Sequence, residues 1–291
     1  MASLMPLRRR ITAVKATQKL THAMRLVAIA SHSKQKNGYA IAQRHRQMIE
    51  STFFEIIKTY PKWRHPILTP ENQTNSNPLI IIISPIRGMC GSFRNNLVRY
   101  AATKLKFEYY QSPSFITIGS RAQQIAQTSL EAKSEKTPNI ITHFAELSVN
   151  SIIDVSQEIN SAISSQKKPF SRITYLGSTF VNLFTQKPKL HTIAPLLPPE
   201  NGNHQKKTEI VKYIWEQEKE KILETFAQNY LRITIQQALY ESLFAEDAAR
   251  FVAMDMATTN AEKHLETMKL EFNKIRQTSI TQEVTELSSA F

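Results

Sequence analysis

Glycine and proline are missing from the last 89 residues of this 291-residue chain. No glycine follows Gly202 and no proline follows Pro199, although twelve of the thirteen prolines lie between Pro61 and Pro199. Because these residue types are the strongest helix breakers, nothing local interrupts a helix through residues 217–288. About seventy residues at roughly 1.5 Å each give a helix on the order of 105 Å long. Such a helix needs a second long helix, or another protein, beside it.

Cysteine and long apolar runs are also scarce. The one cysteine, Cys90, excludes an internal disulfide and a multi-cysteine zinc site, and is typical of a reducing compartment. The longest aliphatic run, residues 79–83, is far shorter than the roughly twenty residues of a transmembrane helix. Residues 1–10 contain no apolar signal core. We therefore expect no removable presequence and a protein on the cytosolic side.

Sequence motifs of nucleotide binding, metal binding and nucleophilic catalysis are absent. Gly88 and Gly91 are too few for a phosphate cradle, and no Gly-Lys-Ser or Gly-Lys-Thr follows them. The eight histidines form no His-Glu-x-x-His pair, and no serine lies in a Gly-x-Ser-x-Gly elbow. Cys90 has no motif-level base beside it, so we interpret it as a buried packing residue. We expect no active site, cofactor or metal in this chain.

Apolar and small residues recur at helical spacing in both terminal segments. In the last third the stripe is Phe251, Met254, Ala257, Ala261, Leu265, Met268, Phe272, Ile275 and Ser279. Near the N-terminus one predicted inward track is Leu7, Ile11, Val14, Gln18 and Thr21, and a neighbouring one is Leu20, Met24, Val27 and Ser31. Steps of three and four residues mark the face of a helix that packs against a partner. Between Pro6 and Pro61 only Gly38 breaks the N-terminal run.

The middle of the chain alternates short apolar runs with helical stretches. The predicted strands are residues 79–84, 115–118, 140–144, 172–177, 180–183 and 190–194. This alternation predicts a small, mainly parallel α/β sheet. We thus expect an N-terminal coiled-coil helix (1–60), a Rossmann-like α/β head (61–206) and a C-terminal coiled-coil helix (207–291). The two terminal helices can meet only by running antiparallel, as a stalk that carries a head.

The net charge of +13 is unevenly distributed. Residues 1–60 hold eleven Lys or Arg and two Glu, a net charge of +9; residues 61–206 carry +8, and residues 207–291 carry −4. A basic helix paired with an acidic one explains this pattern, and a basic coiled coil that binds nucleic acid is the alternative. Such a binder would lose affinity steeply with salt, but the aromatic residues of a stacking platform are missing from residues 1–60. A Rossmann-like enzyme would require a glycine-rich turn at residues 86–91 followed by an acidic residue, which is not present.

Three separated segments, residues 10–28, 249–261 and 272–283, resemble the gamma subunit of F-type ATP synthase of the bacterial type, as does the turn at residues 84–91. The resemblance covers the whole chain. It implies a non-catalytic central rotor subunit that couples proton flow through the membrane sector to ATP synthesis, or the reverse. The implied partners are the alpha and beta subunits of the catalytic ring, the epsilon subunit and the membrane c-ring, with no nucleic acid. The implied location is peripheral, on the cytoplasmic side of the inner membrane.

The resemblance also implies subunit-coupling residues on the last helix. Arg276, Gln277 and Thr281 match positions at which family members are thought to hydrogen-bond a beta-subunit loop. A guanidinium fork suits such docking, and the alternative is a solvated helix face. Glu246 and Arg250 match further coupling positions, and the alternative is an ordinary pair one helical turn apart.

On the first helix, Met24 and Arg25 match the place where the family's beta lever pushes on the shaft; for Met24 the alternative is plain coiled-coil packing. Two departures from the family pattern stand out. Pro85 and Ile86 occupy the place before Arg87 where the family usually has an acidic residue, which puts an ion pair from that turn in doubt. His22 replaces the usual basic side chain and introduces a titratable group.

Overall fold

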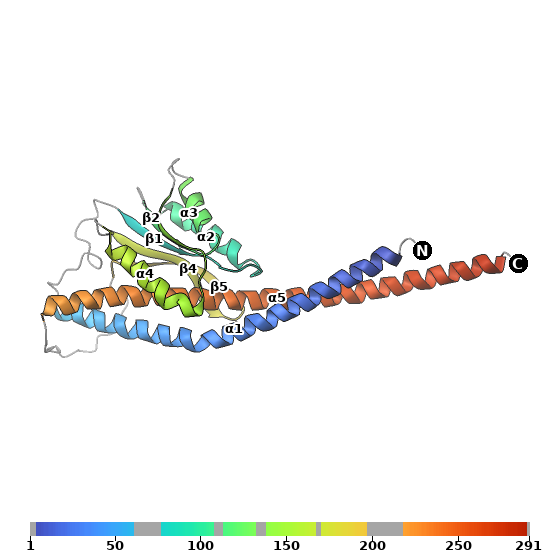
Figure 1. Ribbon diagram of the computed structural model, residues 1–291, viewed down its shortest axis with the longest axis horizontal. Helices are drawn as coiled ribbons and strands as arrows, with labels where there is room; N and C mark the ends of the chain where they lie inside the picture. The colour runs from blue at the N-terminus through green and yellow to red at the C-terminus, as the bar shows by residue number, and fades with distance from the viewer. Residues whose placement is uncertain are drawn as a thin grey trace.

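The computed structural model describes residues 4–60, 77–107, 113–131, 138–166, 170–196 and 218–289. The predicted boundary between residues 206 and 207 falls outside these ranges. Two long helices, a five-stranded sheet and the shorter helices that connect its strands make up the described residues (Figure 1).

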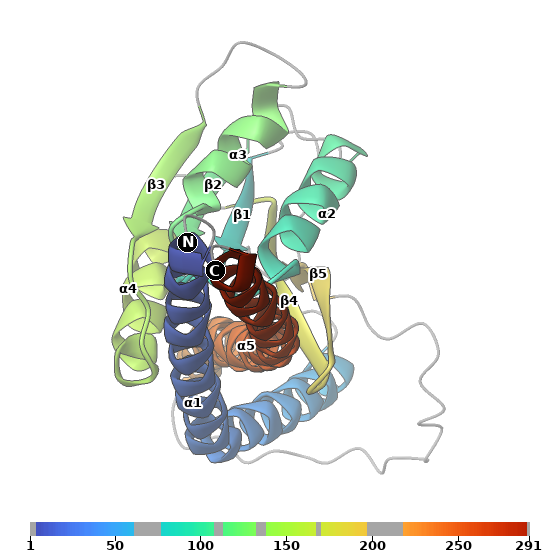
Figure 2. The ribbon, with the colours of Figure 1, turned by 90° about the vertical axis from the view of Figure 1, so that its right-hand side faces the viewer.

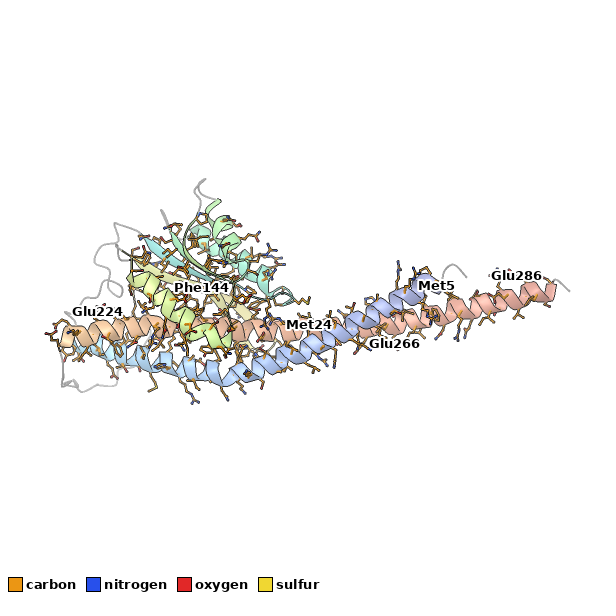
Figure 3. The ribbon with its side chains drawn as sticks, in the orientation of Figure 1. Met5, Met24, Phe144, Glu224, Glu266 and Glu286 are labelled. Carbon is orange, nitrogen blue, oxygen red and sulfur yellow. The ribbon has the colours of Figure 1, made fainter. Side chains whose placement is uncertain are left out.

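Helix α1 (Leu4–Thr59) has 56 residues and helix α5 (Lys219–Ser289) has 71. They run antiparallel, with both chain ends at the same end of the molecule and the head at the other (Figure 1). The end of α5 continues beyond the start of α1, since Met5 lies between Glu266 and Glu286 along the long axis (Figure 3). The predicted stalk and its antiparallel direction are therefore confirmed.

The stripe predicted on α5 faces α1. Met254, Ala261 and Leu265 are buried, and the other members are half-buried as far as Ser279. Beyond Ser279, every described residue of α5 is exposed. Burial therefore fades toward the tip of α5, which extends beyond the first residues of α1.

The two tracks predicted on α1 have different outcomes. The first, from Leu7 to Thr21, is half-buried or buried, as predicted. The second is wrong at two positions, because Leu20 is 57% exposed and Val27 is 63% exposed. Each lies one position before a buried residue, Thr21 or Ala28, and one residue turns a helix by about 100°. Leu20 and Val27 therefore point away from α5.

The head is a sheet with strand order β3-β2-β1-β4-β5. The strands are β1 (Pro78–Ile83), β2 (Ser114–Ile118), β3 (Asn139–Phe144), β4 (Arg172–Asn182) and β5 (Thr185–Ala194). The pairs from β3 to β4 are parallel, and β4 and β5 form an antiparallel hairpin. The connecting helices are α2 (Phe93–Phe107), α3 (Ala122–Glu131), and the short η1 (Val149–Ser151) followed by α4 (Ile152–Ser164). The predicted α/β head with a mainly parallel sheet is confirmed.

One strand prediction needs correction. The two strands predicted at residues 172–177 and 180–183 are one strand, β4, which passes through Gly177 and ends at Asn182. A Cβ atom on Gly177 would lie 2.9 Å from the hydroxyl oxygen of Ser242 in α5. The glycine thus allows close packing of sheet against helix and does not end a strand.

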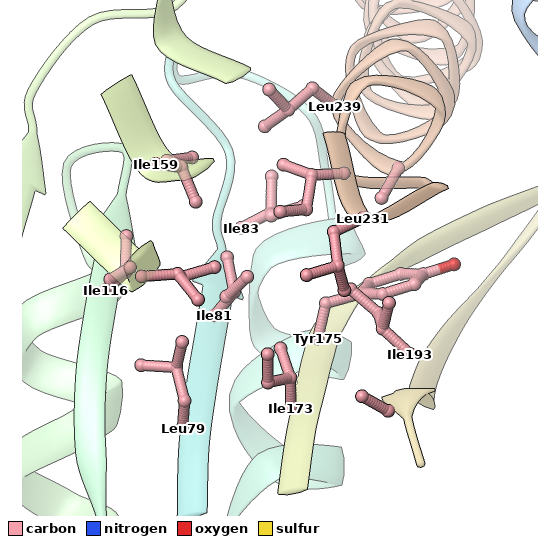
Figure 4. Close-up of a cluster of buried hydrophobic side chains, with 14 of the residues drawn as sticks. Leu79, Ile81, Ile83, Ile116, Ile159, Ile173, Tyr175, Ile193, Leu231 and Leu239 are labelled. Atoms are coloured by element: carbon pink, nitrogen blue, oxygen red, sulfur yellow. The ribbon is translucent and has the colours of Figure 1, made fainter. Parts of the chain in front are cut away.

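Helices cover both faces of the sheet. Helices α2 and α3 lie on the side away from the long helices (Figure 2), around a core that includes Ile80, Ile82 and Leu97. On the other face, α4 and the first part of α5 bury a larger core. Figure 4 shows Leu231 and Leu239 of α5 packed toward the strands. Helix α5 is therefore shared between stalk and head, which fixes the head to the shaft.

Candidate coupling site

The turn after β1 is held by one carboxylate of α5. The backbone N–H of Ile86 donates to Glu246 Oε2 at 2.9 Å, and the backbone N–H of Arg87 donates to Glu246 Oε1 at 3.0 Å. Glu246 is 3% exposed. The residue before Arg87 is Ile86, whose side chain has no charge. Main-chain N–H groups make the contact with Glu246 instead. The turn is thus attached to α5 without an acidic side chain at residue 86.

Arg250 neutralises this carboxylate and its neighbour. Its two terminal nitrogens donate to Glu246 and Asp247, and its Nε donates to the carbonyl of Gly88 at 3.3 Å. Glu246 and Arg250, one helical turn apart on α5, therefore bind two N–H groups and one carbonyl group of the head turn. The predicted pair of Glu246 and Arg250 exists, and it is buried inside the chain.

Asp247 extends the cluster to α1. Its Oδ2 accepts from the hydroxyl of Ser31 at 2.6 Å and from Nε2 of Gln35 at 2.7 Å. The sequence placed Ser31 on a predicted inward track of α1, but it indicated no site role for Ser31, Gln35 or Asp247. A signal for Gln35 was present, because it continues the inward track of α1 and is 6% exposed. Head turn, α5 and α1 thus meet at one buried polar cluster, Ser31, Gln35, Glu246, Asp247 and Arg250, which we call the joint.

The turn has an unusual backbone that brings it close to α5. Met89 has a φ of 62°, which is rare for a residue with a side chain, and Gly91 has a φ of 59°. A Cβ on Gly91 would lie 3.3 Å from Cβ of Ala253. Nearby, Cys90 packs against Phe93, Ala245 and Ala249, and burial raises the pKa of its thiol. The prediction that Cys90 is a buried packing residue is confirmed.

The pair predicted on α1 lies farther along the stalk. Arg25 forms a salt bridge with Asp255 of α5 at 2.7 Å, with both side chains partly exposed. Its other terminal nitrogen lies 3.1 Å from Nδ1 of His22. Met24 is half-buried beside them. Arg25 is therefore bound to the second helix, and half-burial leaves part of Met24 accessible.

The three residues predicted on the last turns lie on the exposed tip. Arg276, Gln277 and Thr281 are exposed, and Thr281 donates its hydroxyl to the carbonyl of Gln277 at 2.9 Å. Large apolar side chains are exposed with them: Leu270, Ile280, Val284 and Leu287. The structure thus places the predicted residues at three levels: tip, mid-stalk and joint.

A second buried polar cluster lies between the stalk and the β4–β5 hairpin. Arg46 of α1 donates to Gln237 Oε1 and contacts Nε2 of His191, both at 3.3 Å. Gln237 in turn donates to Glu241 at 3.0 Å. Burial, with help from Arg46 and Lys189, lowers the pKa of His191 to about 4. Burial raises the pKa of Glu241.

No group of three or more His, Cys, Asp or Glu in the described ranges is placed to hold a metal ion. Within the same ranges, no helix has the length and apolar character needed to cross a membrane.

A long, unequal helix pair with an α/β head fixed to one end by a buried joint defines a stalk protein. Residues 3–291 match the family model described as ATP synthase. The ATP synthase gamma chain of Histophilus somni is 30% identical over 290 residues, which cover 99% of this chain and 98% of that one. The gamma chain of Pelotomaculum thermopropionicum is 29% identical, with 99% and 97% covered. The chain belongs to the ATP synthase gamma chain family.

Solved structures agree on the fold. The rotor of the Euglena gracilis mitochondrial ATP synthase matches with a TM-score of 0.59 at 15% identity, covering 96% of this chain and 99% of that chain. The central stalk of the Tetrahymena thermophila enzyme matches with a TM-score of 0.52 at 16% identity, covering 82% and 99%.

Proposed function

We propose that this chain is the central rotor subunit of a proton-translocating ATP synthase. It couples proton flow through the membrane sector to ATP synthesis at a ring of alpha and beta subunits, or runs in reverse during hydrolysis. The observation that carries the proposal is the relationship to gamma chains over 99% of the sequence. The stalk with its projecting tip is the shape that this role requires.

The partners divide along the long axis of the molecule. The tip of α5 turns inside the alpha/beta ring, and the head sits on the epsilon subunit and the membrane c-ring. The chain is then peripheral to the membrane, on the cytoplasmic side of the inner membrane. The domain division at residues 60/61 and 206/207 follows from these roles, because the two helical segments form the stalk and the middle segment forms the head.

Three sets of residues carry the coupling. Arg276, Gln277 and Thr281 dock on a beta-subunit loop, which their exposure on the tip permits. Met24 and Arg25 receive the push of the beta subunit at mid-stalk. The Arg25–Asp255 salt bridge passes that push to the second helix.

Glu246 and Arg250 act at the other end of the same path. Their buried contacts with the turn at residues 86–88 transmit rotation between shaft and head. No partner contact is needed for this role.

The chain itself has no catalytic role in this proposal and takes no cofactor. Glu246 of α5 binds the turn after β1, where an open α/β sheet would place a ligand, and this supports the assignment. The catalytic sites then belong to the ring that the shaft turns in.

Co-assembly with alpha and beta subunits tests the proposal. We expect a stable complex with one copy of this chain for six large subunits, and ATP hydrolysis that requires all three components. A control chain truncated after Thr267 should bind less tightly, because it lacks the tip. Failure of the full chain to assemble at any salt concentration would count decisively against the proposal.

A further inference from the structure

The Glu246 carboxylate is bound as a ligand would be. Each of its two oxygens accepts one backbone N–H of the turn, at 2.9 and 3.0 Å, and one oxygen also accepts from Arg250. Consecutive main-chain N–H groups that converge on one anion form a recurring anion-binding arrangement in proteins. The donors are main-chain atoms, so the turn itself provides the site and α5 provides the anion.

The position in the fold supports this interpretation. The turn follows the carboxyl end of β1, which pairs with β2 on one side and β4 on the other. The strand order reverses at β1, because the chain moves outward to β2 and β3 and then returns to β4. In open α/β sheets, ligands bind outside the carboxyl ends of the strands at such a reversal. In this chain the place is occupied by a side chain that follows about 160 residues later.

The surroundings would also favour a small oxyanion. A cavity of about 200 Å³ adjoins Glu246, and Lys34, Gln35, Arg87, Arg250 and Asp247 are among the residues that line it. Three of these are cationic, and the Asp247 carboxylate is paired with Arg250. Gln35 is 6% exposed, and its Oε1 has no hydrogen-bond partner among the described residues. This acceptor could receive the O–H of a hydrogenphosphate or of a protonated carboxyl group.

We propose that the turn at residues 85–91 is a small-oxyanion site of the carboxylate and phosphate class, and that Glu246 occupies it as a built-in ligand. The tethered carboxylate is always near the site, so free anions do not displace it at ordinary concentrations. Binding of Glu246 in this site then attaches the head to α5. The part that this site plays in rotation rests on the coupling role proposed for Glu246. Anion binding by the turn does not depend on that role and needs no other subunit.

Chemical rescue of E246A in the full chain tests the site. The readout is hydrogen exchange at the backbone amides of Ile86 and Arg87, measured in chloride, formate or phosphate at equal ionic strength. In chloride we expect exchange about 10- to 100-fold faster than in the wild type, because hydrogen bonds to a charged group are lost. Formate or phosphate should slow it again by filling the vacated site. E262A is the matched control, since Glu262 pairs with Gln18 on the exposed stalk, and its exchange at residues 86 and 87 should equal the wild type.

E246Q separates site occupancy from a general salt effect. Its amide fills the site without the charge, so exchange should be faster than in the wild type and formate should not restore it. Equal rescue of E246Q and E246A, or wild-type exchange in E246A, would overturn the proposal. If E246A folds only in formate or phosphate, that result supports the site. If it folds in no anion, E246Q decides: fast exchange supports the site and wild-type exchange overturns it.

These outcomes are independent of the proposed rotor function. Rescue with failed co-assembly would leave the oxyanion site standing and remove the rotor role. Co-assembly without rescue would do the opposite.

Discussion

At the scale of single residues, Arg250 has the largest energetic role that we can assign. Its guanidinium is 8% exposed and faces two buried carboxylates, Glu246 and Asp247. In the low dielectric of a protein interior, two carboxylates without their common cation repel each other and lose their solvation. The same side chain also binds the carbonyl of Gly88, so it joins the head to α5.

Replacing Arg250 with Ala should therefore lower the free energy of unfolding by about 3–5 kcal/mol. Urea denaturation of the isolated chain measures the change. Arg25→Ala is the matched control and should cost no more than about 1 kcal/mol, because the Arg25–Asp255 pair is partly exposed. Similar losses in the two variants would contradict a buried joint.

Gly119 is a second position where stability depends on a single side chain, because an added Cβ atom would clash with Ser84. Its φ of 92° and its close approach to the end of β1 both require glycine, since a Cβ would lie 2.4 Å from the carbonyl oxygen of Ser84. Gly119→Ala should destabilise the head by about 3 kcal/mol or more. Gly88→Ala provides the comparison, because no described atom lies within 4 Å of its Cβ position, and we expect a change within about 1 kcal/mol. Thermal unfolding followed by circular dichroism distinguishes the two variants.

His191 makes stability depend on pH in a defined window. Its pKa is about 4 in the folded chain against an ordinary value of 6.5, so the unfolded chain binds the proton more tightly between these values. Stability from the neutral ring is complete above about pH 6.5 and is lost as the pH falls toward 4. Arg46 and Lys189 also disfavour the charged ring, while the raised pKa of Glu241 gives an opposite trend as the pH rises.

Comparison with His191→Gln isolates this contribution, because the other groups titrate in both proteins. The wild type should lose stability relative to the variant between pH 6.5 and 4, and the two should run parallel above pH 7. Urea midpoints at several pH values provide the measurement. A constant difference across the whole range would show that His191 does not titrate in this way.

At the scale of elements, α1 has two faces with different tasks. One face packs on α5, and the other carries exposed apolar residues such as Leu20, Val27 and Ile41. Neighbouring positions report the two faces separately. Ala28 is 1% exposed and Val27 is 63% exposed.

We expect Ala28→Gln to destabilise the helix pair by about 2–3 kcal/mol, because the larger polar side chain cannot fit against α5. Val27→Gln should change the isolated chain by no more than about 0.5 kcal/mol. Denaturant titration of both variants tests the assignment of the faces. An equal loss in both would mean that α1 is rotated relative to the packing described above.

At the scale of the whole molecule, the unequal helix lengths divide α5 into a part that packs on α1 and the head and a tip that extends beyond α1. The head and the helix pair are complete before the last turns of α5, whose residues beyond Ser279 are all exposed as far as Ser289. Those turns add nothing to the core of the head, and they are free to contact other subunits.

Truncation after Thr267 should therefore leave the head folded while weakening coupled proton pumping in reconstituted membranes. Near-ultraviolet circular dichroism reports the head, and a pH-sensitive dye reports pumping. The matched control is the full-length triple variant Arg276→Ala, Gln277→Ala and Thr281→Ala. It removes the three tip side chains while α5 keeps its full length. Unchanged pumping in both would refute the docking role of the tip.

Much of this architecture was readable from the sequence because it is encoded locally. The absence of Gly and Pro after residue 202 allowed one long helix, and the periodicity from Phe251 to Ser279 identified its packed face. The aliphatic run at residues 79–83 predicted a strand buried on both faces, and β1 is that strand. A period of 3.6 or 2 residues is a property of neighbouring positions, so no distant contact is needed to recognise it.

The joint was decided only by the tertiary structure. Glu246 and Arg250 resemble an ordinary helical pair in the sequence, and nothing near them shows that two backbone N–H groups of residues 86 and 87 lie opposite. Gly177 likewise suggests a strand end until Ser242 of α5 is placed against it. Such contacts join segments about 65 to 160 residues apart. Local periodicity says which face of an element is buried, whereas the partner of that face depends on how all the elements pack together.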